Sequence, residues 1–418
     1  MKVNINKFTG FCGCGKEHKV FVKDIIIEKG AIEKLPEILK KENYKNVTVI
    51  CDENTYLAAA EEIIDIIPNS NCIKLESRNL HANEIAVQKV YDNLQNEIDV
   101  LIAVGSGTIH DITRYVAYNK DIPFISVPTA ASVDGFVSSV AAMTWRGYKK
   151  TFTAVSPIYV VADTEIFKEA PYRLTASGVS DLIGKYTALV DWKISSIVIG
   201  EYICNKVCNI EIEAVNKLCE CIDELVLGSE EAYEQLMYAL ILSGLAMQII
   251  GNSRPASGAE HHLAHLWEME IINNDVNALH GEKVSVGLLV VMEEYDKIKK
   301  SIKNSRCRVR AYSGIEEEML KDEISNKQMY KLVMKENNPD PLSNINRVIL
   351  QHRLENIAEI LEKLPTIDFV KDKLKKAKAV TTFEEIGLSE SIKRKSIRIS
   401  PYVRNRITLM RLAKMLEY

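Results

Sequence analysis

The first 165 residues alternate short apolar runs with stretches of helical spacing. Four runs rich in β-branched residues each end at a polar or glycine-rich turn: 47–55 (VTVICDENT), 99–107 (DVLIAVGSG), 123–130 (PFISVPTA) and 158–166 (IYVVADTEI). Helical spacing separates the early runs, as in 82–98 (ANEIAVQKVYDNLQNEI). Continuous apolar strands that alternate with helices are typical of a mostly parallel sheet covered on both faces. We therefore predict an α/β domain over residues 1–170, with ligands bound where the strands end.

The pattern changes near residue 171. Apolar residues recur every three to four positions in 174–195, 231–250 and 282–300, and no convincing strand follows. We therefore predict an all-α domain over residues 171–418. No repeat or low-complexity linker is visible, so we expect the two domains to abut and to form the active-site cleft between them. The longest uncharged apolar stretch, 238–251, has only 14 residues. It predicts a buried helix and no membrane span.

Composition limits the class of protein. A chain of 418 residues is long enough for two domains, and 47% hydrophobic with 26% charged residues is typical of a globular protein. A net charge of −4 argues against a nucleic-acid partner, which would require a basic excess. The N-terminus lacks the apolar segment of a signal peptide, and the nine cysteines form no disulfide framework. We expect a cytoplasmic protein.

The segment FCGCGKEH places Cys12, Cys14 and His18 within seven residues. Thiolates and imidazole are zinc ligands, but a structural zinc site needs four ligands and commonly has wider cysteine spacing. The sequence leaves this candidate metal site open. The pairs Cys204/Cys208 and Cys219/Cys221 fall in a helical region and are interpreted as core or surface residues.

Three predicted strands end in residues that can contact a ligand. In AVGSGTIHD (103–111), Gly105 and Gly107 allow close approach of a phosphate to the backbone, although a simple glycine turn explains them equally well. The spacing departs from G-x-G-x-x-G. Asp52 ends an earlier strand, where it can accept hydrogen bonds from a ribose or cap the next turn. A third strand is followed by Thr129, Ser132 and Asp134.

The segment GAEHHLAHLWE (258–268) contains three histidines. His261 and His265 are four residues apart and share one face of a helix, whereas His262 points about 100° away. Such a pair can be a simple surface feature. A further histidine, His280, begins another helical run, and Asp181 lies within an apolar helical pattern. One carboxylate with two imidazoles would leave coordination positions open on a divalent metal, which indicates a catalytic site.

The motifs GSGTIHD, PTAASVDGFVS, GVSDLIGK, SGAEHHLAH and LHGEKV occur in this order. Together they resemble the iron-containing alcohol dehydrogenase and dehydroquinate synthase-like superfamily, and within it the bacterial-type glycerol-1-phosphate dehydrogenases. The resemblance covers most of the chain. It implies a Rossmann-like sheet for NAD or NADP, a homodimer, and one divalent nickel, zinc or iron ion. The implied reaction is the reversible reduction of dihydroxyacetone phosphate, a phosphorylated triose, to sn-glycerol 1-phosphate.

The resemblance also assigns roles to individual residues. The metal ligands are Asp181, His261 and His280, and the substrate contacts are Asp134, Asp181 and His265. Asp181 and His265 are the candidate catalytic residues, with His265 placed to relay a proton. The cofactor-binding residues are Asp52, Gly105, Gly107, Thr108, Ile109, His110, Asp111, Thr129, Ala130, Ala131, Ser132 and Ser138.

Other features concern specificity. Asp52 would repel a 2′-phosphate and favours NAD, while Arg254 and Lys283 are candidate partners of the substrate phosphate. Ser180 stands where the family usually has glycine, and no histidine occurs near Ser196, where the family pattern has one. A glycerol dehydrogenase, a dehydroquinate synthase-like cyclase and a cofactor-binding protein without turnover are the alternative functions.

Overall fold

The computed structural model describes residues 3–269 and 276–418. The chain divides into two compact units. The first comprises Met1–Leu182 and Glu213–Ser253, and the second comprises Ile183–Ile212 and Arg254–Tyr418. The predicted domain boundary at residues 170–171 stays a prediction. Each unit is described separately.

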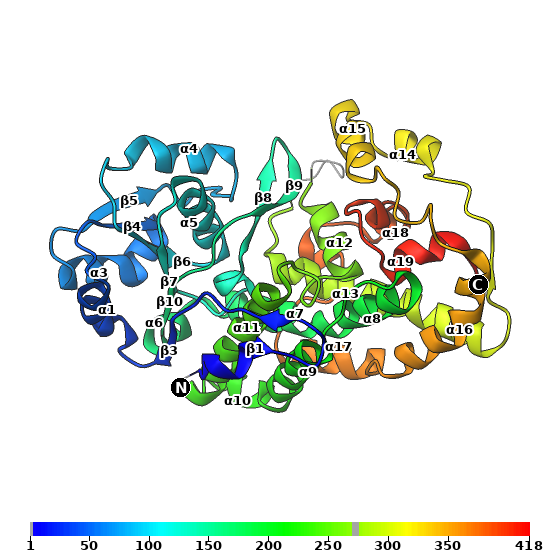
Figure 1. The fold of residues 1–418 in the computed structure, drawn as a ribbon, viewed down its shortest axis with the longest axis horizontal. Helices are drawn as coiled ribbons and strands as arrows, with labels where there is room; N and C mark the ends of the chain where they lie inside the picture. Colours follow the sequence, from blue (N-terminus) through cyan, green and yellow to red (C-terminus); the bar gives the residue numbers. More distant parts are fainter. Residues whose placement is uncertain (1–2, 270–275) are drawn as a thin grey trace. The chain divides into compact units, whose positions relative to one another are not determined.

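The first unit is built on a six-stranded parallel sheet (Figure 1). Its strand order is β3-β10-β7-β6-β4-β5. The strands are β3 (Asp24–Glu28), β4 (Val47–Asp52), β5 (Asn71–Leu75), β6 (Val100–Gly105), β7 (Phe124–Pro128) and β10 (Tyr159–Asp163). All pairings between them are parallel. The parallel sheet is confirmed, and four of its strands coincide with the four apolar runs.

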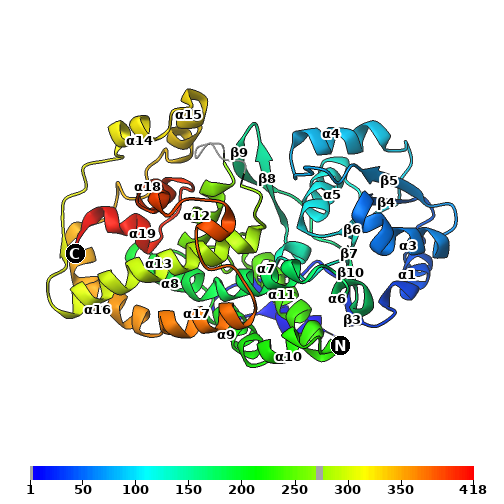
Figure 2. The ribbon, with the colours of Figure 1, turned by 180° about the vertical axis from the view of Figure 1, so that it is seen from behind.

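Helices cover both faces of this sheet, as Figure 2 shows from behind. On one face, α1 (Leu35–Glu42) and α3 (Glu61–Ile66) pack against side chains such as Val49. On the other, α4 (Glu84–Asn93) and α5 (Gly107–Lys120) pack against Ile50. Neighbouring strand residues therefore contribute to opposite cores, which is why the strands read as continuous apolar runs. The predicted helix 82–98 corresponds to α4 and is shorter than expected.

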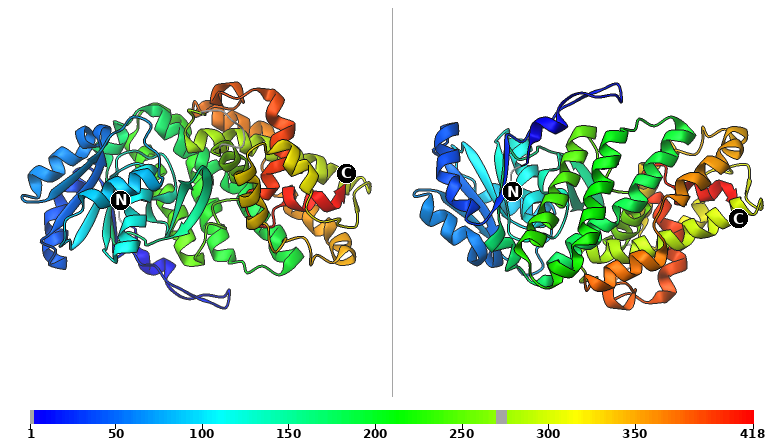
Figure 3. Two further views of the ribbon diagram at one scale, coloured as in Figure 1. Left: turned by 90° about the horizontal axis from the view of Figure 1, so that it is seen from above. Right: turned by 90° about the horizontal axis from the view of Figure 1, so that it is seen from below.

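Two antiparallel hairpins of the first unit were not predicted. One is β8 (Val140–Trp145) with β9 (Tyr148–Thr153), and the other is β1 (Gly10–Phe11) with β2 (Glu17–His18). In Figure 3 the N-terminal hairpin, in dark blue, extends away from the sheet.

Further helices complete the first unit. They include α6 (Thr164–Lys168), α10 (Ile222–Val226) and α11 (Glu230–Ile250), while α7 (Tyr172–Ile183) and α9 (Asn205–Glu220) run across the division between the units. By length and composition α11 could cross a membrane, but 72% of its most apolar window is buried within the protein. The buried helix predicted at 238–251 is thus part of α11.

The second unit consists mainly of helices. Its longest helix, α13 (His280–Lys303), packs against α12 (Ala259–Trp267), α16 (Arg347–Glu362), α17 (Ile367–Lys376) and α8 (Lys185–Ile199). The shorter helices are α14 (Glu317–Glu323), α15 (Lys327–Glu336), α18 (Lys393–Ile399) and α19 (Leu409–Leu412). The helical character is confirmed, but the expectation that no strand follows residue 171 is wrong. The two-residue strands β11 (Arg308–Val309) and β12 (Leu416–Glu417) pair antiparallel, and they are too short to show a periodic pattern.

A buried carboxylate, Asp191 of α8, joins three segments of the second unit. Its oxygens accept hydrogen bonds from the amides of Ala259 (2.8 Å) and Leu409 (2.7 Å) and from the hydroxyl of Tyr295. Burial and the nearby Glu260 together raise the pKa of Asp191 to about 7, because they outweigh the hydrogen bonds, which act to lower it. Folding therefore favours the protonated form of this side chain.

The pH dependence of stability tests this arrangement. Because the folded-state pKa lies above the unfolded value of about 4, the Asp191 proton stabilises the protein at low pH, and this contribution is lost as pH rises from about 4 to about 7. The quantity to follow is the free energy of unfolding of wild type minus that of Asp191→Asn. We expect this difference to fall across this pH range by at most about 1.4 kcal/mol per pH unit. Urea unfolding of both proteins measures it. Parallel pH profiles would contradict the assignment.

Candidate functional site

In the first unit, the carboxyl end of β4 is a helix cap. Asp52 Oδ1 accepts hydrogen bonds from the amides of Asn54 (2.9 Å) and Thr55 (3.0 Å), and Thr55 Oγ1 accepts one from the Asp52 amide (2.9 Å). The capping role that the sequence allowed for Asp52 is therefore present. Its side chain stays partly exposed, so the ribose contact stays a prediction.

The turn between β6 and α5 brings a helix N-terminus to the carboxyl end of the sheet. A Cβ atom at Gly105 would lie 2.7 Å from Ile109 Cβ, and one at Gly107 would lie 3.0 Å from Val133 Cγ2. Both glycines therefore have a packing reason, besides the close ligand approach suggested by the sequence. The amides at the start of α5 form the kind of N-terminus that binds phosphate.

The side chain of His110, predicted to contact the cofactor, is buried within the unit. Nδ1 lies 2.9 Å from the Ser106 carbonyl oxygen and Nε2 lies 2.7 Å from Ser126 Oγ. Burial, with the nearby Arg114, lowers the pKa of His110 to about 3. The imidazole is therefore neutral and joins α5 to β7. Any contact of residue 110 with a cofactor would use its backbone, and the same holds for the buried Ile109.

Arg114, which the sequence analysis missed, fixes the loop that follows β7. Its guanidinium donates hydrogen bonds to four carbonyl oxygens of this loop, those of Gly135, Phe136, Ser138 and Val140. The side chain is fully buried, and burial lowers its pKa. The available signal was a charged residue among the apolar residues that α5 buries.

The same loop carries Asp134 and contacts Asp181. The Asp134 amide donates a hydrogen bond to Asp181 Oδ2 (3.0 Å), and Ser243 Oγ donates one to Asp134 Oδ2 (2.8 Å). Two of the predicted substrate-contacting residues therefore lie side by side. Ser243 was missed, although a serine within the apolar stretch 238–251 was a visible signal.

Two glycines allow helices to approach this loop. A Cβ atom at Gly178 of α7 would lie 2.1 Å from the Ala131 carbonyl oxygen, and one at Gly244 of α11 would lie 2.9 Å from the Asp134 carbonyl oxygen. Real Cβ atoms do not approach oxygen so closely, so any larger residue would displace the backbone of residues 129–138.

In the second unit, two histidine rings are each oriented by a carboxylate. His261 Nδ1 lies 2.8 Å from Glu260 Oε1, and His280 Nδ1 lies 2.9 Å from Glu268 Oε1. The centroids of the His261 and His280 rings are 5.2 Å apart. A carboxylate at Nδ1 favours the tautomer in which Nε2 carries the lone pair. Metal-ligating histidines typically have this arrangement.

Glu260 is itself held by its surroundings. It accepts hydrogen bonds from Thr187 Oγ1 (2.7 Å) and from the Gly258 amide (2.6 Å). Burial acts to raise the pKa of Glu260, but the interactions with His261, Thr187 and Gly258 outweigh it and lower the pKa. A buried, ionised carboxylate thus lies beside His261.

His262 differs from its neighbour. It is buried, and neither ring nitrogen has a hydrogen-bond partner among the residues that the structure describes. Burial, together with Arg406, Arg404 and Arg254, lowers its pKa well below the usual value. His262 is neutral and has no orienting carboxylate, so the structure favours His261 as the metal-binding member of the pair.

Comparison with known proteins gives the family. A family model for iron-containing alcohol dehydrogenases matches residues 26–171. The chain is 32% identical to a glycerol-1-phosphate dehydrogenase [NAD(P)+] of Geobacillus stearothermophilus, covering 96% of this chain and 94% of that one. The chain belongs to the glycerol-1-phosphate dehydrogenase family.

Other relatives agree with this membership. The protein of the same name from Geobacillus thermodenitrificans is 37% identical over 71% of this chain and 75% of its own. Among solved structures, an iron-containing alcohol dehydrogenase from Corynebacterium glutamicum covers 95% of this chain and 96% of its own, with a TM-score of 0.63 and 15% identity. This last likeness shows the fold alone.

The remaining predicted residues of the second unit are His265, Arg254 and Lys283. His265 lies near both candidate ligands, with ring centroids 6.0 Å from His261 and 5.7 Å from His280. The ligand atoms of His265, Glu268 and His280 also lie within 4.8 Å of one another and form an alternative ligand set. The two candidate phosphate partners lie beside carboxylates: Arg254 Nη2 is 2.7 Å from Glu201 Oε2, and Lys283 Nζ is 3.7 Å from Glu268 Oε1.

The loop carrying Asp134 gives a stability prediction. We expect Gly178→Ala to lower the free energy of unfolding by about 1–3 kcal/mol, because its Cβ atom would overlap the Ala131 carbonyl oxygen. Gly135→Ala is the matched control in the same loop, since a Cβ atom there would meet nothing within 4 Å. Urea unfolding of both variants makes the comparison. An equal effect of the two substitutions would show that the close approach is unimportant.

Proposed function

We propose that this family member catalyses the reversible, NAD(P)H- and metal-dependent reduction of dihydroxyacetone phosphate to sn-glycerol 1-phosphate. The observation that carries the proposal is the pair of histidine–carboxylate hydrogen bonds at His261 and His280. These hydrogen bonds orient two imidazoles for metal binding. The chain is also similar over nearly its full length to a relative named glycerol-1-phosphate dehydrogenase [NAD(P)+].

Asp181, His261 and His280 are the proposed metal ligands. The two imidazoles fit the role because Glu260 and Glu268 fix their tautomers. Asp181 is included on the motif GVSDLIGK, and the Asp134 amide holds one of its oxygens. Two nitrogen ligands and one carboxylate suit nickel, zinc or iron, so the identity of the metal is left to experiment.

The first unit is the proposed cofactor-binding part. A parallel sheet with a helix N-terminus at the carboxyl end of β6 is suited to the phosphates of NAD or NADP. Asp52 would disfavour the extra phosphate of NADP. When bound, the nicotinamide would supply hydride and the metal would polarise the substrate carbonyl.

The chain's own residues would position substrate and move one proton. Asp134, whose carboxylate is oriented by Ser243, is a proposed substrate contact. His265 is the proposed proton relay to the product alkoxide, because imidazole titrates near neutral pH and lies on the face of α12 that carries His261. Arg254 and Lys283 are proposed for the substrate phosphate. The homodimer and the cytoplasmic location stay predictions.

Assay of metal-reconstituted protein tests the reaction. The protein is stripped of metal by a chelator and reloaded separately with nickel, zinc or iron. The reloaded protein should oxidise one molecule of NADH for each molecule of dihydroxyacetone phosphate consumed. Chiral analysis should identify the product as sn-glycerol 1-phosphate. Oxidation of unphosphorylated glycerol at a greater kcat/KM would identify a glycerol dehydrogenase instead. Cofactor binding without turnover with any metal would contradict the proposal, as would cyclase activity without net NADH oxidation.

Three histidine variants test the assigned roles. We expect His261→Ala to lose the metal and turnover, because it removes a ligand. His262→Gln, the matched control one residue away, should keep both. His265→Ala should keep the metal but lose most turnover and the pH dependence of kcat. Metal content by mass spectrometry and pH–rate profiles measure these effects. Loss of metal in His265→Ala with retention in His261→Ala would instead support the set His265, Glu268 and His280.

A further inference from the structure

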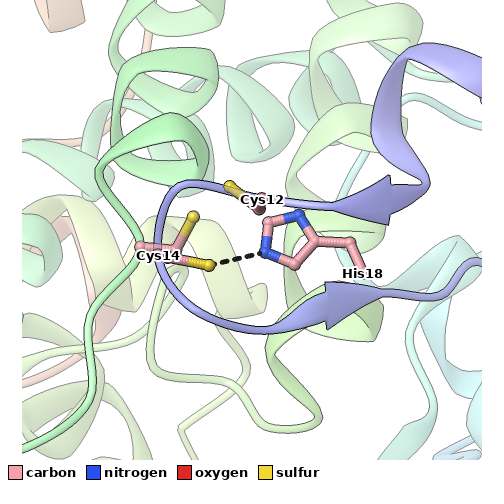
Figure 4. Close-up of side chains that lie close together, drawn as sticks. Cys12, Cys14 and His18 are labelled. Atoms are coloured by element: carbon pink, nitrogen blue, oxygen red, sulfur yellow. Dashed lines mark hydrogen bonds between the residues drawn. The ribbon is translucent and has the colours of Figure 1, made fainter.

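The N-terminal hairpin brings together the three residues of FCGCGKEH that the proposed reaction does not use. β1 and β2 pair through Gly10 with His18 and Phe11 with Glu17. Between them the chain turns back sharply: the Cys12 amide donates to the Lys16 carbonyl oxygen (3.0 Å), and the Gly15 amide donates to the Cys12 carbonyl oxygen (3.0 Å). Gly15 has a φ of +86°, which favours glycine. The turn thereby places both thiols opposite the His18 ring (Figure 4).

The distances among the three side chains suit a single metal ion. Cys14 Sγ lies 3.2 Å from His18 Nε2, and the ligand atoms of Cys12, Cys14 and His18 all lie within 4.8 Å of one another. Around a tetrahedral zinc with bonds of about 2.3 Å to sulfur and 2.0–2.1 Å to nitrogen, a sulfur and a nitrogen are about 3.5 Å apart. The observed separation needs only a small adjustment. The two cysteines are separated by only one residue, but the histidine of the opposite strand supplies a third ligand at a suitable distance.

The strands of this hairpin are short. Each strand has two residues, and Phe11 on the first strand is 92% exposed. His18 on the second strand is buried, at 3% exposure. A two-stranded hairpin by itself is only marginally stable in water, and a bound metal would add to its stability. No disulfide is present among the nine cysteines, all of which the structure describes.

We propose that Cys12, Cys14 and His18 bind a structural zinc ion that fixes the N-terminal hairpin. Two thiolates and one imidazole are donors that zinc prefers, and a fourth protein ligand would complete the tetrahedron. Binding releases the two thiol protons to solvent, with no change in oxidation state. The site is separate from the metal proposed for catalysis and does not depend on the proposed function.

Cobalt binding to the full chain tests the site. Cobalt(II) replaces zinc in tetrahedral sites, and its thiolate complexes show a charge-transfer absorption in the near ultraviolet that nitrogen and oxygen ligands do not give. Reduced, metal-free protein titrated with cobalt should show this absorption, with intense visible bands of tetrahedral geometry, and zinc should abolish both. Wild-type protein without a thiolate–cobalt absorption would overturn the proposal, as would a Cys12–Cys14 disulfide that persists under reducing conditions.

Variants assign the absorption to this hairpin. Cys12→Ser and Cys14→Ser should each lose it and bind about one cobalt ion fewer per chain. His18→Gln should weaken zinc binding at least tenfold in competition with a chelating dye. Cys221→Ser is the matched control, since Cys221 is another partly buried cysteine of the first unit. It should leave the absorption unchanged. Persistence of the absorption in a Cys12→Ser/Cys14→Ser double variant would place the thiolates elsewhere and overturn the proposal.

The test separates this site from the proposed catalytic metal. The catalytic ligand set contains no thiolate, so the absorption reports only on cysteine ligands. Absence of dihydroxyacetone phosphate reduction with the absorption present would contradict the proposed function alone. Reduction without the absorption would contradict the zinc site alone.

Discussion

The hydrogen bonds of one buried carboxylate, Glu260, orient the candidate ligand His261 of the second unit. Glu260 links α8, through Thr187, to the start of α12, through the Gly258 amide, and it orients the His261 ring. A buried charge of this kind is tolerated only when each oxygen is paired. Loss of one partner would leave part of this buried charge unpaired, so the orientation of His261 also depends on Thr187 and Gly258.

Close packing around Glu260 explains why small residues surround it. A Cβ atom at Gly258 would lie 2.7 Å from Asp191 Oδ2, and one at Gly287 of α13 would lie 2.7 Å from the Glu260 carbonyl oxygen. The glycines let α12 approach both α8 and α13. His280 begins α13, so the contact of α13 with α12 also brings the second oriented imidazole beside His261. The close approach of α12 to α13 therefore determines part of the fold of this unit and also brings its two oriented histidines together.

Much of the fold could be predicted from the sequence because its central strands are buried on both faces. β4, β6, β7 and β10 are continuous apolar runs, whereas β5 (NCIKL) mixes polar and apolar residues and β3 is a run of only three isoleucines. The short hairpins have no periodicity to detect. Helical spacing separated His262 from His261 and His265, but the Glu260 and Glu268 contacts that distinguish them depend on side-chain orientation. The pairing of Asp134 with Ser243 joins residues 109 positions apart, which no local pattern can show.

The neutral imidazole of His110 has a consequence for ligand affinity. Its pKa of about 3 keeps it uncharged near neutral pH. The His110 side chain therefore adds no positive charge to the helix N-terminus at the end of β6, where amide groups and the helix dipole, neither of which titrates, would attract an anion. The attraction that these amide groups would exert on an anion therefore does not change with pH.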